Sequence, residues 1–279
     1  MEKISKAQVK FVRSLQLKKV RDAEGLFVAE GEKCVEELRR GFELVSLYRE
    51  GENATRTEIE QMSSLKTPQG VIGVFKKSVR PKDGLSGEAG LILVLDGIQD
   101  PGNLGTIIRT CDWFGVHEIV CSKDTADCYN PKVVQATMGA LARVNLRYLD
   151  LVEWLSPLRL PHKGGEKVRI YGTLLDGKNM YEVLDRTLGT RANEVHADRR
   201  AEAGVARQFS GAVLTNASSL PNAIIMGNEG NGISAEVRKF ITDPIYIPTY
   251  PNKETSDVVE SLNVSIATAI VLAEFRRPR

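Results

Sequence analysis

From residue 91 onward, short apolar runs alternate with amphipathic stretches along the chain. The run Leu91–Leu95 is apolar throughout, which is typical of a strand buried on both faces of a sheet. The same reading predicts further strands at 118–121, 168–175, 223–226 and 244–247, and helices from Gly105 to about Phe114 and at 131–141, 234–240 and 265–275. Strands that alternate with helices favour an α/β domain with a mostly parallel sheet.

The N-terminal part has its own pattern of short elements. It predicts strands at 25–31, 44–48 and 71–75 and a helix at 32–40, which together make a small α/β domain over residues 1–78. Residues 79–90 are rich in glycine and polar side chains and are predicted to be a linker to a second domain at 91–279. Residues 185–212 carry few large apolar side chains and are predicted to be an inserted surface excursion.

Basic residues dominate the first twenty-odd positions. Lys3, Lys6, Lys10 and Arg13 recur at steps of three and four, so a helix would place them on one face, with Ile4, Phe11 and Leu15 on another. Two interpretations carry equal weight: an ordinary solvated helix face, or a surface that contacts nucleic-acid phosphates.

Composition narrows the class of protein. With 279 residues, 42% of them hydrophobic, the chain can bury a large core, and a net charge of +2 does not by itself demand a nucleic-acid partner. The four cysteines form no Cys-x-x-Cys pair, and the three histidines do not cluster near them, so we expect reduced, packed thiols and no metal site. No apolar run is long enough for a signal peptide or a membrane span, and we expect a cytoplasmic protein.

The first of three candidate loops follows the strand at 91–95, at the end where open α/β sheets place their sites. It runs from Asp96 to Gly105 and leads into a helix, and we expect Asn103 and Arg109 to line one wall of this loop and helix. Glycines let backbone come close to a ligand, and the start of a helix presents free N–H groups. The loop is neither a Gly-x-Gly-x-x-Gly fingerprint nor a P-loop.

Two more loops follow later strands. Ile225–Ile233 places three glycines, Gly227, Gly230 and Gly232, around Glu229, and we expect backbone there to approach a ligand closely, although a tight turn alone could explain them. The third loop begins at Ile247-Pro248 and ends in Ser-Leu-Asn-Val-Ser at 261–265. Ser261 and Asn263 suit the start of a helix, and capping is a sufficient reason for at least one of them.

In order and spacing, these three loops resemble the three motifs of the SpoU (TrmH-like) branch of the SPOUT RNA methyltransferases. The segment Arg21…Gly25–Gly31 also resembles the family's N-terminal substrate-binding domain, which is similar to an RNA-binding ribosomal-protein fold. The resemblance implies a trefoil-knotted catalytic domain, S-adenosylmethionine as cofactor and a homodimer. The chain departs from the usual pattern in the 185–212 insertion and in a longer stretch at 249–259.

Site residues are carried over by position in the motifs. The implied catalytic residues are Asn103, Arg109, Glu229, Ser261 and Asn263, and the implied cofactor-binding residues are Gly227, Gly232, Ile247, Pro248 and Leu262. The expected RNA-binding residues are Lys3, Lys6, Lys10, Arg13 and Arg21. Arg109 has two candidate roles: it holds a phosphate and stabilises alkoxide charge, or it acts as the base after losing its own proton, which an ordinary arginine resists.

The function implied is methyl transfer from S-adenosylmethionine to a ribose 2′-hydroxyl of RNA, with large-subunit ribosomal RNA favoured over transfer RNA. Three alternatives stay open: a transfer-RNA 2′-O-methyltransferase of the same family, an RNA-binding module without catalysis, and a small-molecule enzyme that binds a nucleotide at Asp96–Arg109. The sequence predicts no metal and no membrane partner.

Overall fold

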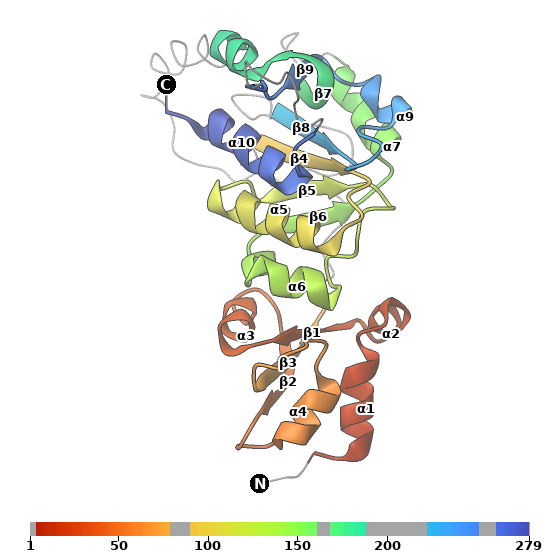
Figure 1. The fold of residues 1–279 in the computed structure, drawn as a ribbon. Helices are drawn as coiled ribbons and strands as arrows, with labels where there is room; N and C mark the ends of the chain where they lie inside the picture. The colour runs from red at the N-terminus through yellow and green to blue at the C-terminus, as the bar shows by residue number, and fades with distance from the viewer. Residues whose placement is uncertain (1–3, 79–89, 161–167, 188–221, 251–260, 279) are drawn as a thin grey trace, which may run out of the picture. The chain divides into compact units, whose positions relative to one another are not determined.

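The computed structural model of this protein describes residues 4–78, 90–160, 168–187, 222–250 and 261–278. It divides into two compact units. The first unit comprises 1–80, 100–112 and 126–144, and the second comprises 81–99, 113–125 and 145–279. Figure 1 labels the helices and strands of both.

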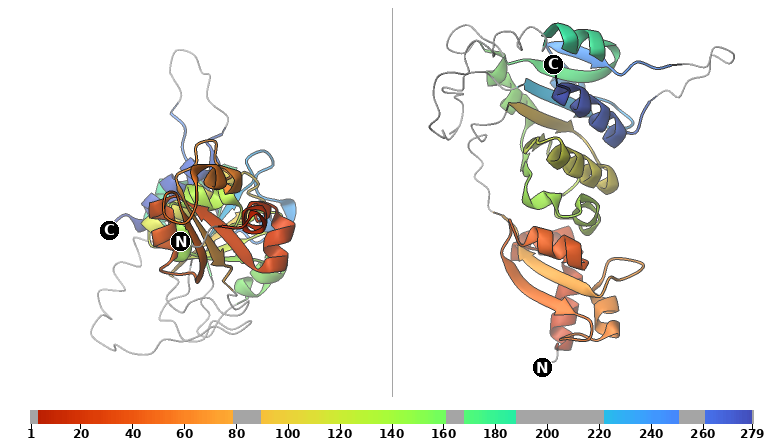
Figure 2. Two further views of the ribbon diagram at one scale, coloured as in Figure 1. Left: turned by 90° about the horizontal axis from the view of Figure 1, so that it is seen from below. Right: turned by 90° about the vertical axis from the view of Figure 1, so that its left-hand side faces the viewer.

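A three-stranded antiparallel sheet, in the order β1-β3-β2, forms the centre of residues 4–78. Its strands are β1 (Leu26–Glu30), β2 (Leu44–Arg49) and β3 (Val71–Lys76), and its helices are α1 (Lys6–Ser14), α2 (Lys18–Glu24), α3 (Glu32–Leu38) and α4 (Arg56–Met62). Side chains alternate across each strand. Val28 and Val74 therefore pack against α1 and α4 on one face, whereas Phe27 stacks on Phe75 on the other face. The ribbon views show the helices and strands of this module (Figures 1 and 2).

The basic N-terminal stretch forms two helices with a break between them. Ser5 and Gln8 make a capping box at the start of α1, and the helix ends at Leu15. The prediction of its apolar face was partly wrong: Leu15 is buried, but Phe11 is 38% exposed and Val9 and Val12 fill the core. Valines at positions 9 and 12 continue the three-to-four spacing that reaches Leu15.

Two helical segments of the first unit come from later in the chain. They are α5 (Pro101–Trp113, of which 101–112 belongs to this unit) and α6 (Pro131–Thr137), which is followed by a 3₁₀ turn at Ala140–Ala142. The helix predicted at 131–141 ends early because Met138 and Gly139 adopt positive φ angles of 50° and 89°. At Gly105, α5 touches α6 so closely that an added Cβ would lie 2.4 Å from Cβ of Ala136.

The second unit contains the predicted parallel sheet. All its pairings are parallel, and the strand order is β6-β5-β4-β8-β7-β9. The strands are β4 (Leu91–Asp96), β5 (Glu118–Cys121), β6 (Asn145–Tyr148), β7 (Ile170–Asn179), β8 (Asn222–Gly227) and β9 (Asp243–Tyr246). Its helices are α7 (Leu151–Leu155), a 3₁₀ turn at Ser156–Arg159, a helix at 180–187, α9 (Ala235–Arg238) and α10 (Val264–Arg276).

Helices cover the two faces of this sheet, as a parallel sheet requires. Ile170 and its neighbours pack with Leu155 of α7 and Val237 of α9, while the next residue, Tyr171, points the other way and meets Phe275 of α10 edge to face. This alternation accounts for the core of the second unit. No helix in the described part of the chain is long and apolar enough to cross a membrane.

Several sequence expectations fall on residues that the structure does not describe. The linker at 79–90, except Gly90, and the insertion at 185–212, except its first three residues, lie outside the described residues. The trefoil knot remains an expectation, because it depends on the path of residues 251–260, which are also outside them. The sequence reading also missed β6, α4 and α7, which are four to seven residues long.

Replacing Phe27 tests the packing of the first unit. Phe27 is fully buried between Phe42, Phe75 and Tyr129, at ring-centroid distances of 4.8–5.6 Å. We expect Phe27→Ala to lower the free energy of unfolding by about 3–5 kcal/mol, the usual result for a buried aromatic ring. Phe11→Ala is the matched control and should cost less than about 1 kcal/mol. Equal losses in urea unfolding of the two variants would contradict this packing.

Candidate active site

The ends of two neighbouring strands bring the first two candidate loops together. β4 and β8 pair in parallel, with Asp96 opposite Gly227, so the loops that follow these residues leave the same edge of the sheet. The Asn228 side chain joins the two loops, because its Nδ2 donates to the carbonyl oxygen of Gly97 over 2.7 Å. The Asp96 carboxylate accepts from the backbone N–H of Ser234 at 2.7 Å.

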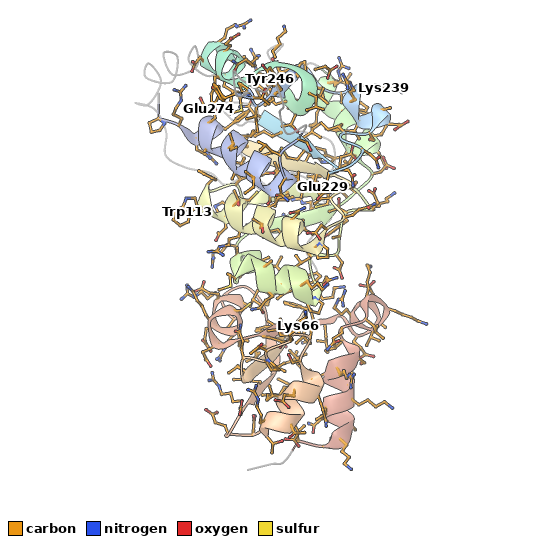
Figure 3. The ribbon with its side chains drawn as sticks, in the orientation of Figure 1. Lys66, Trp113, Glu229, Lys239, Tyr246 and Glu274 are labelled. Carbon is orange, nitrogen blue, oxygen red and sulfur yellow. The ribbon has the colours of Figure 1, made fainter. Side chains whose placement is uncertain are left out.

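A tight turn follows β8. Asn228 and Gly232 exchange two backbone hydrogen bonds of 2.9 Å, and the Asn228 carboxamide oxygen accepts from the N–H groups of Gly230 and Asn231. Glu229 is exposed at this turn (Figure 3). A Cβ at Gly227 would lie 2.3 Å from the backbone carbon of Gly232, and Gly232 has a φ of +67°. Closure of the turn is thus sufficient reason for both glycines.

The third loop provides the start of the last helix. Asn263 is the N-cap of α10 and its side-chain oxygen accepts from the N–H of Ser265 at 3.0 Å and of Ile266 at 3.4 Å. The expectation of a capping residue is confirmed at Asn263. Ser261 and Leu262 precede the cap and are exposed, whereas Ile247 and Pro248 follow the end of β9 and are half-buried.

Asn103 and Arg109 lie in α5, in the first unit. The backbone N–H of Asn103 donates to the Asp100 carboxylate at 2.8 Å, which anchors the first turn of the helix. Arg109 is exposed six residues further on. Six residues are about one and two-thirds helical turns, so the two side chains share the helix but not one strip along it. The structure thus groups Gly227, Glu229 and Gly232 in one turn, Ser261, Leu262 and Asn263 at one helix start, and Asn103 and Arg109 in one helix.

The expected RNA-binding residues divide into two kinds. Lys6, Lys10 and Arg13 are exposed on α1, whereas Lys3 lies outside the described residues. Arg21 is different: it is 2% exposed, and Asp127 pairs with it at 2.6 Å. The structure gives Arg21 an internal role in place of the expected RNA contact, because its guanidinium is enclosed by protein acceptors.

Other ionisable groups do not extend the candidate site. The four cysteines are free and buried, as expected, and burial raises the pKa of the Cys34 thiol to about 11 and that of Cys111 above its ordinary value. Thiols in this state are poor nucleophiles. Within the described ranges, no three histidine, cysteine or acidic side chains are grouped to hold a metal ion.

Sequence reasoning missed Asn228 and Asp96, which organise the loops. The signal for Asn228 was present, since asparagine beside glycines is a common turn residue whose carboxamide bonds to the backbone two residues on. Asp96 was noted only as the first residue of a loop. The neighbouring sequence does not indicate its hydrogen bond with Ser234, because that residue lies 138 positions away.

A parallel α/β sheet with glycine-rich loops and a capped helix at its carboxyl edge defines a ligand-binding domain of the α/β enzyme class. Comparison with known proteins narrows this class: the SpoU rRNA Methylase family matches residues 90–273, and the chain belongs to that family. The MRM3-like substrate binding domain matches residues 6–57. The recognition made from the three motifs is therefore confirmed.

Individual relatives match most or nearly all of the chain. The chain is 26% identical over 291 residues to the Bacillus subtilis 23S rRNA (guanosine(2553)-2′-O)-methyltransferase RlmP, covering 99% of this chain and 98% of that one. It is 27% identical to the human mitochondrial rRNA methyltransferase 3 and spans 56% of that protein's length.

Solved structures of RNA methyltransferases also match nearly the whole chain. A TrmH-family protein from Porphyromonas gingivalis matches with a TM-score of 0.75 and 34% identity, over 99% of both chains. The AdoMet-bound rRNA methyltransferase from Sinorhizobium meliloti matches with a TM-score of 0.69 and 26% identity, over 99% of this chain and 96% of that one. The fold class expected from the sequence, a parallel α/β domain with a small N-terminal α/β domain, is confirmed.

The bond between Asn228 and Gly97 gives a specific test of how the loops are held. Asn228→Asp keeps an oxygen acceptor for the turn but cannot donate to the Gly97 carbonyl. We expect it to lower the free energy of unfolding by about 1–3 kcal/mol, as for a carbonyl left facing another acceptor. Asn231→Asp, an exposed change in the same turn, should stay within about 0.5 kcal/mol. If both variants unfold alike in urea, Asn228 does not join the loops.

Proposed function

We propose that this protein transfers a methyl group from S-adenosylmethionine to a ribose 2′-hydroxyl of large-subunit ribosomal RNA. The observation that carries the proposal is the pairing of β4 with β8, which delivers two family motifs to one edge of the sheet in a chain of the SpoU family. The relatives named above support ribosomal RNA as the substrate class.

The residues present fit the cofactor. The turn at 228–232 offers backbone groups at the end of β8, and Leu262 offers an apolar side chain that is 51% exposed just before α10. A nucleoside site combines apolar surface with a few fixed polar groups in this way. We propose that Gly227, Gly232, Ile247, Pro248 and Leu262 hold S-adenosylmethionine.

The chemistry is a substitution at a methyl carbon. When bound, S-adenosylmethionine supplies the methyl group, whose bond to sulfur breaks as a bond to the ribose 2′-oxygen forms. The protein must align the ribose and deal with the proton of its 2′-hydroxyl. We propose that Arg109 holds the adjoining phosphate and stabilises the negative charge that develops on the oxygen while the hydroxyl proton passes to solvent water, since a guanidinium remains protonated at neutral pH.

The remaining motif residues have supporting roles in this proposal. Asn263 fixes the start of α10 through three hydrogen bonds, and Ser261 lies two residues before it. Asn103 belongs to the first turn of the helix that carries Arg109. Glu229 supplies a carboxylate that can orient a cation of the site. These four residues thus position groups around the reaction.

The exposed face of α1 is the proposed RNA contact. Lys6, Lys10 and Arg13 lie on it, and α1 has no acidic residue in its first turn. Lys18 lies outside this face and is paired with Asp22, whose pKa falls to about 2 through hydrogen bonds from Lys18 and Lys77. Phosphate contacts of this kind supply affinity without reading the sequence.

Arg109 gives the test of the mechanism. Purified protein should methylate ribosomal RNA with labelled S-adenosylmethionine, and mapping of 2′-O-methyl groups in a deletion strain should show one missing site. Arg109→Ala should slow single-turnover transfer by about 10²–10³-fold, as for loss of a group that stabilises developing charge, while calorimetry shows unchanged cofactor binding. Arg109→Lys separates the two roles: charge stabilisation predicts partial activity, whereas a base role predicts a rate that rises towards the lysine pKa of about 10.4.

Arg159→Ala is the control for that experiment, because Arg159 is an exposed arginine that bonds only to the Lys239 carbonyl among the contacts described. It should retain wild-type rates. Near-normal transfer by Arg109→Ala would exclude both roles, and lack of transfer by the wild-type protein together with lack of cofactor binding would favour an RNA-binding module without catalysis.

We also propose a homodimer. Several large apolar side chains of the second unit are solvent-exposed in the single chain, among them Trp113, which is 85% exposed, and Ile266, which is 53% exposed. Trp113 projects from the end of α5 (Figure 3), and Arg276 of α10 donates to the carbonyl of nearby Gly115. Exposed apolar groups of this size mark contact surfaces.

Sedimentation tests the dimer. The wild-type protein should sediment at twice the chain mass of 30.8 kDa, and Trp113→Asp should shift it to the monomer by placing a charge in the contact. Val152→Asp, at another exposed apolar side chain (40% exposed), is the matched control and should remain dimeric. A wild-type monomer would contradict the proposal.

A further inference from the structure

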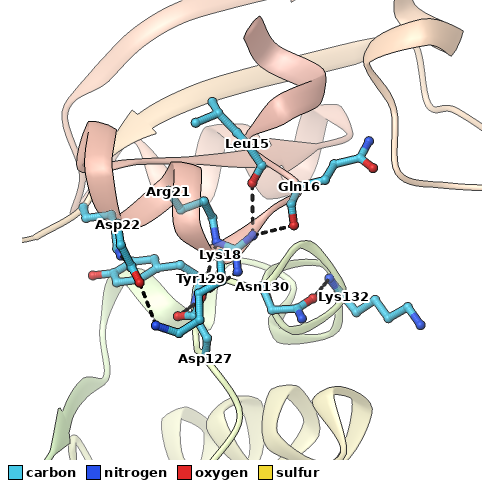
Figure 4. Close-up of polar contacts among 10 residues, drawn as sticks. Leu15, Gln16, Lys18, Arg21, Asp22, Asp127, Tyr129, Asn130 and Lys132 are labelled. Carbon is cyan, nitrogen blue, oxygen red and sulfur yellow. Dashed lines mark hydrogen bonds and ion pairs between the residues drawn. The ribbon is translucent and has the colours of Figure 1, made fainter. Parts of the chain in front are cut away.

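Arg21 ties the N-terminal module, residues 4–78, to the docking segment, residues 126–144. Both belong to the first compact unit. The Arg21 guanidinium donates to Asp127 from Nη2 at 2.6 Å and from Nε at 3.3 Å (Figure 4). Its Nη1 donates to the carbonyl oxygens of Leu15 at 3.0 Å and Gln16 at 2.7 Å. One side chain therefore fixes the end of α1 to the docking segment.

Both side chains of this ion pair are shielded from water and held in one orientation. Arg21 is 2% exposed and Asp127 13%, so water does not screen the contact as it would at the surface. The other oxygen of Asp127 accepts from the backbone N–H of Tyr129 at 3.0 Å. Each partner is thus held by its own segment, and the pair sets the angle at which the two segments meet.

Further contacts, made by Tyr129 and Arg143, join the same two segments. Tyr129 packs against Phe27 and Phe42 of the module, and the Lys77 ammonium lies 5.0 Å from its ring centre. Arg143 of the docking segment bonds to Glu37 of α3 at 2.7 Å. The module therefore meets the docking segment at several points, among them the Arg21–Asp127 pair, whose arginine is 2% exposed.

The docking segment in turn holds the helix that carries Arg109. Gly105 of α5 packs directly on Ala136, with no room for a side chain between them. Arg143 also pairs with Asp112 of α5 at 2.7 Å. These two contacts lie four residues before Arg109 and three residues after it, so they fix its helix on both sides.

We propose that Arg21 and Asp127 are positioning residues that set the distance and angle between the RNA-contacting face of α1 and Arg109, and so determine which ribose is methylated. The inference rests on the proposed function. A continuous series of packed contacts connects the RNA-contacting face of α1 to Arg109. It runs through Arg21, Asp127, α6 and α5, so it fixes where RNA bound on α1 lies relative to Arg109. Misalignment at this pair lowers the rate of transfer without removing any group that binds RNA or cofactor.

The experiment compares Asp127→Asn and Arg21→Met with a matched control, Arg49→Met. Arg49 also makes an arginine–carboxylate pair, with Glu32 at 2.5 Å, but that pair lies wholly within the N-terminal module. Asp127→Asn keeps the shape of the side chain, removes its charge and replaces one acceptor oxygen by an NH2 group. It is the milder change and is expected to retain the fold if Arg21→Met does not. Thermal unfolding and calorimetry with S-adenosylmethionine confirm that each variant is folded.

Two readouts separate positioning from a merely structural role. With ribosomal RNA, kcat for Asp127→Asn should fall by about 10–100-fold, the scale of a small misplacement of reacting groups, with RNA affinity unchanged. Mapping of the product should show methyl groups at neighbouring riboses. The double variant Lys6→Glu/Lys10→Glu should do the opposite and weaken RNA affinity more than kcat. Arg49→Met should match the wild type in both readouts.

The outcomes are distinct. If the wild-type protein transfers no methyl group, the proposed function fails and this inference fails with it. If the wild type is active and folded Asp127→Asn keeps its kcat and its single product site, only the positioning role is overturned. A fall confined to RNA affinity, or an equal fall in Arg49→Met, overturns it as well.

Discussion

The parallel pairing of β4 with β8 is the constraint on which the site depends. β4 is buried along its whole length and lies between β5 and β8, so its register is fixed from both sides. That register places Asp96 beside Gly227 and sends two loops out of one edge of the sheet. A shift of one residue would turn every β4 side chain to the opposite face, and the loops would no longer meet through Asn228 and Gly97.

Sequence patterns predicted the helices and strands whose burial or capping follows from their own residues. The continuous apolar run at 91–95 announced a strand buried on both faces, and short polar side chains before an apolar helix announced the cap at Asn263. The sequence did not predict β6, because three of its four residues are only partly buried and two of the four are polar, which reflects its place at the sheet edge. The sequence did not predict the Arg21–Asp127 ion pair for a different reason. The two residues are 106 positions apart, and the local sequence of each is typical of an ordinary surface charge.

The glycines of the second loop show how a correct motif can have more than one physical cause. Their density suggested that backbone approaches a ligand. The turn itself requires Gly227, which faces the backbone of Gly232, and favours glycine at position 232, where φ is positive. A site built this way places its backbone groups before any ligand arrives, so that little ordering is needed on binding. The same residues then serve the turn and the proposed cofactor site without conflict.

A buried arginine at position 21 needs a reason beyond stability. Replacing a buried ion pair by apolar side chains is often neutral or stabilising by about 1–4 kcal/mol, so selection for stability alone would favour a leucine or methionine here. An apolar side chain makes contacts that do not depend on angle, whereas a hydrogen bond does depend on it. The guanidinium donates to the carbonyl oxygens of Leu15 and Gln16, just past the end of α1 where helix carbonyls lack internal partners, and to Asp127 on the other side. An angle-dependent contact of this kind restricts how α1 lies against the docking segment, whereas an apolar contact at the same place would tolerate sliding.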